Sequence, residues 1–192
     1  MARVPYRSPE TFDGDESSLK SAMAREDLPE SYRDIYSTEL RRVHRALANN
    51  PPVLDAFRAY SGTLWRESGL SVRERELVIL AVASETGSRY EWHQHVRHGL
   101  VAGLDESEIR AIGASQIEPF EDREAALVSY ARAVAAQEVD DALQEALEQY
   151  VSDYTVVGIG ALAAAYIGLA HLLDALAVTP EEPFVGWELD GL

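Results

Sequence analysis

Residues able to transfer protons recur at helical spacing in the segment RYEWHQHVRHGL. Glu91 and His95 are four residues apart and His98 follows three residues later, so all three side chains share one face of a predicted helix. Glu76 approaches the same face if the preceding helix packs antiparallel to this one. Such a convergence of two carboxylates and an imidazole suits acid–base catalysis, because burial and a neighbouring carboxylate shift the pKa values of Glu and His side chains.

Two other interpretations of this cluster are open. Glu91 and His95 also form an ordinary polar pair on a helix, and the helix dipole favours a carboxylate such as Glu76 in a first turn. A metal is the second alternative, since the carboxylates and imidazoles offer oxygen and nitrogen ligands on neighbouring helices. The duplicated Glu-x-x-His motif of carboxylate-bridged metal sites is missing from the sequence, so we predict no metal and no cofactor.

The other histidines are predicted to lie away from this face. His93 points a quarter turn or more from it and is expected to be exposed, as is His44 on its own helix. His171 and Asp174 are the strongly polar residues of the apolar C-terminal helix. A buried polar group needs a partner, so His171 either belongs to a core or interface network or is a secondary catalytic candidate.

The composition excludes several classes of function. The chain has 33 acidic and 17 basic residues, and its net charge of -16 would be repelled by nucleic acids and by anionic membrane surfaces. It contains no cysteine, which excludes thiolate nucleophiles and thiolate metal ligands. The N-terminal residues lack the pattern of a secretory signal, so we predict a cytoplasmic protein. The predicted partner is a small molecule.

Hydrophobic spacing predicts helices along most of the chain and no strand. A Ser-x-x-Glu capping box at Ser71 starts the helix that contains Glu76, and Gly87 with Ser88 ends it. We expect an all-α fold of about eight helices, over residues 31–49, 51–66, 71–86, 89–101, from 105, 122–137, 141–150 and 153–178.

Two segments have a distinctive composition. Residues 1–28 are polar and acidic, so we expect an N-terminal arm that orders only against a partner surface, if at all, ahead of a single domain over residues 29–192. The run from Thr155 to Leu173 carries no formal charge and is long enough to span a bilayer. Its interior is rich in Ala and Gly rather than Leu and Ile, so we predict a buried core helix and no membrane span.

The segment RERELVILAVASETGSRYEWHQHVRHGLVAGLDESEI resembles the core helical hairpin of the carboxymuconolactone decarboxylase and AhpD-like superfamily. The resemblance implies an AhpD-like helical bundle with a central antiparallel helical hairpin. In the peroxidase branch the hairpin carries a Glu, a Cys-x-x-Cys motif and a His, and that spacing falls here on Glu76, Ser88, Glu91 and His95. Ser and Glu cannot cycle through a disulfide, so a thiol peroxidase mechanism is excluded.

The decarboxylase branch resembles this chain in having a Glu and a His four residues apart on one helix, often after a His at the position of Tyr90. The resemblance implies a cofactor-independent lyase or decarboxylase that acts on a small organic acid or lactone. His95 would donate or accept the proton, Glu91 would orient it and Glu76 would complete the polar pocket. The secondary candidates are Ser88, Tyr90, His98 and His171.

The alternative is a protein that keeps the fold without being an enzyme. It would bind a small ligand, or be structural, after losing the superfamily's redox cysteines, and the polar cluster would be a structural network. Members of the superfamily assemble as dimers, trimers or hexamers, so the resemblance implies a homo-oligomer. A carboxylate substrate would need a positive partner, for which the hairpin offers Arg73, Arg75, Arg89 and Arg97.

Overall fold

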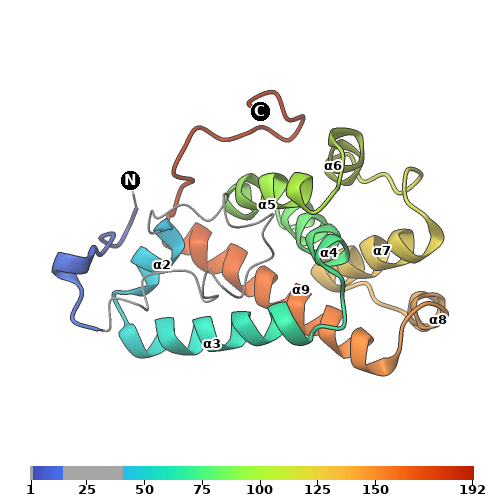
Figure 1. Cartoon of the computed structure of the whole chain (residues 1–192), viewed down its shortest axis with the longest axis horizontal. Coiled ribbons are helices and arrows are strands. Elements are labelled where there is room, and N and C mark those ends of the chain that lie inside the picture. Colours follow the sequence, from blue (N-terminus) through green and yellow to red (C-terminus); the bar gives the residue numbers. More distant parts are fainter. Residues whose placement is uncertain (1, 15–40) are drawn as a thin grey trace.

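The computed structural model describes residues 2–14 and 41–192 of the chain (Figure 1). Within these residues there are eight α-helices, one short 3-10 helix and no strand, which confirms the all-α prediction. The elements are η1 (Pro9–Thr11), α2 (Arg42–Leu47), α3 (Pro51–Glu67), α4 (Val72–Glu85), α5 (Arg89–Val101), α6 (Glu106–Gly113), α7 (Asp122–Ala136), α8 (Asp141–Glu148) and α9 (Asp153–Ala175). The part of the first predicted helix over residues 31–40 lies outside the described residues.

Helices α4 and α5 form the central antiparallel hairpin. Ser71 caps α4 through the predicted box, its hydroxyl accepting from the backbone N–H of Glu74 while the Glu74 carboxylate accepts from the N–H of Ser71. The turn to α5 passes through Gly87 at φ +65°, a left-handed conformation that glycine adopts without strain. Helix α4 is buried over most of its length and contacts α5, α6, α7 and α9. Glu76 is therefore held inside the bundle, opposite α5.

The long apolar helix α9 is buried on one side only. Thr155, Ile159 and Leu162 face the bundle, whereas Val157 is 70% exposed. By length and composition α9 could cross a membrane, yet only 28% of its most apolar 18-residue window is buried. The prediction of a buried core helix is thus correct for one face, because the helix is apolar all round while the neighbouring helices cover a single side of it.

The two ends of the described chain add to the core in ways that periodicity did not indicate. Residues 2–14 contact the end of α9, where Arg3 N–H donates to the Leu176 carbonyl at 2.8 Å, and α2, where Arg7 N–H donates to the Arg45 carbonyl at 3.0 Å. Phe12 is buried in a second apolar cluster with Val43 and Leu173. This part of the predicted arm belongs to the fold, and residues 15–28 of the arm lie outside the described residues.

The C-terminal segment after α9 packs against α5. Trp92 Nε1 donates to the Gly186 carbonyl at 3.0 Å, and the Trp92 and Trp187 rings are 5.1 Å apart. Val185 N–H donates to His93 Nδ1 at 3.1 Å, and His93 is only 4% exposed. The prediction that His93 is exposed is therefore wrong: the face of α5 that points away from the hairpin is covered by this segment.

Candidate functional site

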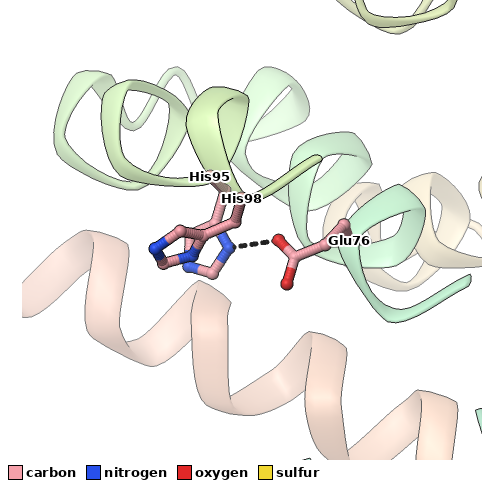
Figure 2. Close-up of side chains that lie close together, drawn as sticks. All are labelled: Glu76, His95 and His98. Atoms are coloured by element: carbon pink, nitrogen blue, oxygen red, sulfur yellow. Dashed lines mark hydrogen bonds and ion pairs between the residues drawn. The ribbon is translucent and has the colours of Figure 1, made fainter. Parts of the chain in front are cut away.

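The centre of the site is a hydrogen bond between α4 and α5. Glu76 Oε2 lies 2.7 Å from His95 Nδ1, and both side chains are buried, Glu76 completely (Figure 2). His98 lies beside them, with its ring 4.8 Å from that of His95 in an edge-on arrangement. The hairpin thus brings Glu76 to the helical face on which spacing placed His95 and His98. A carboxylate on one imidazole nitrogen fixes the ring and directs the other nitrogen elsewhere.

Glu91 is the second carboxylate of the cluster. Its Oε2 lies 3.6 Å from His95 Nε2, which is longer than the contact from Glu76. The orienting contact expected from Glu91 is therefore made by Glu76. Burial raises the pKa of Glu91 to about 7, with His95 and then Arg41 partly opposing the rise. In the described part of the chain Glu91 Oε1 has no hydrogen-bond partner, so this side chain can carry a proton next to His95 near neutral pH.

This raised pKa predicts that stability falls as pH rises. The folded protein keeps the Glu91 proton up to about pH 7, whereas the unfolded chain releases it above the ordinary pKa of 4.5. The stabilisation is complete below pH 4.5 and is lost towards pH 7, by up to about 3 kcal/mol. Glu91→Gln, which keeps the neutral shape, should be more stable than the wild type at pH 8 and no more stable at pH 4.5.

Urea unfolding at a series of pH values measures this difference. The charged groups that act on Glu91 are His95, Arg41 and Glu181, and all remain in the variant. Glu85→Gln, at an exposed position on α4, is the matched control. A pH-independent difference between the wild type and Glu91→Gln would show that folding does not raise the pKa of Glu91.

A cavity of about 120 Å³ adjoins the His95 and His98 rings. It lies between α2, α3, α5 and α9, and its walls are mainly apolar and aromatic. The Tyr166 ring of α9 stands edge-on to His95, 5.1 Å away. The apolar and aromatic members of the lining are Val43, Phe57, Leu64, Trp65, Tyr90, Leu162, Ala165, Tyr166 and Leu169. A ligand here would lie against mainly apolar walls beside an imidazole.

The polar end of the cavity contains residues that the sequence did not reveal. Arg41 lines it, with Nη2 3.5 Å from His98 Nε2. His44 lines it too and is only 8% exposed, so its predicted surface position is wrong. Burial, followed by the charges of Arg41 and Arg58, lowers the pKa of His44 to about 3. The pair Arg41-Arg42 was a signal in the sequence, since a helix that begins there can turn one cation inward.

The four arginines of the hairpin make other contacts. Arg73 pairs with Glu108 and Glu124. Arg75 lies over the Trp65 ring at 3.5 Å, and Arg89 over the Phe184 ring at 4.5 Å. Arg97 pairs with Glu182 on the surface. None of these four is among the described residues that line the cavity.

The secondary candidates have different surroundings. Ser88 caps α5 by accepting from the Glu91 backbone N–H at 3.4 Å, a structural role. The Tyr90 hydroxyl donates to Glu181 at 3.0 Å, and Tyr90 lines the cavity. Burial, with Glu181 contributing, raises the pKa of Tyr90 well above its ordinary value. His171 is exposed and lines a separate groove with Asp174, so the structure does not bring it to His95.

The donor atoms of Glu76, His95 and His98 lie within 4.8 Å of one another, so this set could hold a metal ion. An ion here would have to replace the 2.7 Å hydrogen bond between Glu76 and His95. It would also bind next to the Arg41 guanidinium, whose charge opposes that of a cation. The hydrogen-bonded arrangement therefore fits proton transfer better than metal binding.

Fold and site together define an all-α protein with a buried Glu–His pair at the wall of an apolar cavity. Its architecture is the AhpD-like one, as solved structures with the same fold show. An uncharacterized peroxidase-related protein from Silicibacter sp. TM1040 has a TM-score of 0.75 at 22% identity, covering 95% of this chain and 92% of its own. The debrominase Bmp8 gives 0.71 at 16% identity, covering 88% and 95%. An alkylhydroperoxidase AhpD core protein from Ralstonia eutropha JMP134 gives 0.63 at 21% identity, covering 88% and 96%.

Residues 51–137 match the model of the Carboxymuconolactone decarboxylase family. This region runs from α3 to the end of α7, is similar to that family and contains no cysteine. The matched region contains Glu76, Glu91 and His95. A comparison with curated proteins gives no match.

Proposed function

We propose that the protein is a cofactor-independent acid–base enzyme, a lyase or decarboxylase acting on a small organic acid or lactone. The observation that supports this most directly is the position of His95, hydrogen-bonded through Nδ1 to the fully buried Glu76 and facing an apolar cavity. A positioned imidazole that can donate and accept a proton is what such chemistry needs. We also propose that the protein works in the cytoplasm.

In this proposal His95 carries the proton through Nε2. The Glu76 carboxylate accepts from Nδ1–H, which holds the ring and stabilises the imidazolium. When a carbon–carbon bond to a carboxylate breaks, its electron pair forms an enolate and carbon dioxide leaves. The imidazolium then gives its Nε2 proton to the enolate carbon and recovers one from solvent. Glu91, 3.6 Å from Nε2, is the group that relays that proton.

A panel of γ-lactone acids and related small carboxylates in D2O tests this function. NMR follows loss of substrate and incorporation of deuterium at carbon, while released carbon dioxide is trapped and counted. We expect turnover or exchange that depends on the enzyme concentration and is unchanged by a metal chelator. Neither turnover nor exchange with any compound would favour the second function, a non-catalytic ligand-binding protein. The structural form of that alternative, in which the polar cluster is only a network, expects no useful cavity beside His95, whereas a cavity adjoins it.

We propose further that the protein is a homo-oligomer associating through the exposed face of α9. This face includes Tyr154 and Val157, which are 58% and 70% exposed, and α9 has no Asp, Glu, Lys or Arg between its exposed end residues Asp153 and Asp174. The net charge of -16 disfavours anionic membranes as the partner of this face. Val157→Asp should lower the mass measured by light scattering from a multiple of 21.2 kDa towards that value. Val139→Asp, at a site 42% exposed between α7 and α8, is the control. A wild-type mass of one chain would contradict the proposal.

A further inference from the structure

The cavity beside His95 differs in charge from the protein around it. The chain carries 33 acidic and 17 basic residues, yet none of the described residues that line the cavity is Asp or Glu. One arginine, Arg41, and three histidines, His44, His95 and His98, belong to that lining. Among the described residues, the pocket lining of this negatively charged chain thus has ionisable side chains that, tyrosines apart, can only be positive or neutral. This pattern favours an anionic ligand.

Arg41 supplies the permanent charge of this lining. Burial lowers the pKa of both His44 and His98, and the nearby guanidinium of Arg41 contributes to each shift. These two imidazoles are therefore neutral at pH 7 and can only donate or accept hydrogen bonds. A guanidinium keeps its charge at any physiological pH and presents N–H groups in a planar fork that matches a carboxylate.

The remaining walls set the shape of the ligand. They are formed largely by aromatic and aliphatic side chains, among them Phe57, Trp65 and Leu162. The volume of about 120 Å³ is close to the roughly 150 Å³ of a cavity that accepts one benzene ring. A second carboxylate would have to lie against apolar walls without a partner, which is costly.

We propose that Arg41 binds the carboxylate of a small, ring-sized monoanionic acid whose apolar body fills the cavity next to His95. The inference rests on the proposed function, since it names the substrate class of the same site. A guanidinium stabilises the carboxylate charge that loss of carbon dioxide would remove. A monoanionic ligand held in this way cannot lose its only carboxylate as carbon dioxide. Within the proposed function, the binding mode therefore favours the lyase alternative, in which His95 moves a proton while the anchored carboxylate stays on the ligand.

Calorimetric titration with benzoate, benzamide and phthalate tests the inference without needing turnover. Benzoate should bind the wild type about tenfold or more tightly than its neutral isostere benzamide, because a charge-assisted hydrogen bond replaces a neutral one. Phthalate, with two charges, should bind more weakly than benzoate. Arg41→Gln should lower benzoate affinity to that of benzamide and leave benzamide unchanged, which shows that the cavity is intact.

Two control variants separate the possible causes. Arg97→Gln removes the same charge from an exposed site paired with Glu182 and should not alter benzoate binding. His171→Gln, at an exposed histidine outside the lining of this cavity, should likewise leave benzoate binding unchanged. Equal affinity for benzoate and benzamide in the wild type, including no binding of either, would overturn the inference, as would an unchanged preference in Arg41→Gln. A benzoate preference without turnover of any panel compound would support the inference and contradict the proposed function.

Discussion

Replacing His95 with Gln is expected to lower kcat by about 10²- to 10⁴-fold on the substrate that the panel identifies, which is the usual contribution of a positioned general acid or base. Gln can still donate a hydrogen bond to Glu76, so the buried carboxylate keeps a partner and the fold is preserved. It cannot carry a proton at the position of Nε2. Steady-state kinetics with KM reported separately is the measurement, since the loss should fall on kcat.

His171→Gln is the matched control for this variant. His171 is an exposed histidine on α9 outside the lining of the His95 cavity, so its replacement should leave kcat unchanged. Circular dichroism and urea unfolding should show His95→Gln to be folded. Wild-type kcat in His95→Gln would reject the proton-carrier role, even with the cavity and ligand binding intact.

Replacing Gly158 with Ala is expected to destabilise the protein by about 2 kcal/mol or more, in the range that overpacking of a tight contact produces. A Cβ on Gly158 would lie 2.1 Å from the carbonyl oxygen of Ser68, the C-cap of α3. Backbone cannot swing aside as a flexible side chain can, so α9 must move away from α3. Because both helices line the cavity, the shift should also weaken benzoate binding.

Gly160→Ala provides the comparison on the same helix. No atom lies within 4 Å of the Cβ position at Gly160. The change should therefore stabilise the protein by up to about 1 kcal/mol, the ordinary advantage of Ala over Gly in a helix. Chemical denaturation measures the free energy of unfolding of both variants. Similar values for the two would show that α3 and α9 are not in close contact at Gly158.

The sequence alone determined the features that depend on local order. Capping signals such as Ser71 with Glu74 and the turn at Gly87 set the helix ends, because caps and turns involve residues only a few positions apart. The spacing of Glu91 and His95 placed both on one face for the same reason. The sequence also predicted that Glu76 meets this face. A turn as short as the one between α4 and α5 requires the two helices to pack antiparallel.

The tertiary structure alone decided which faces are covered. His93 is buried because the C-terminal segment, some ninety residues away in sequence, crosses α5 and donates to its imidazole. Arg41 reaches His98 across 57 positions, and Val157 stays exposed because no described helix packs there. Helical periodicity gives the direction of a side chain but not what lies opposite it. The charge and shape of the cavity were therefore beyond the sequence pattern, because distant segments supply its walls.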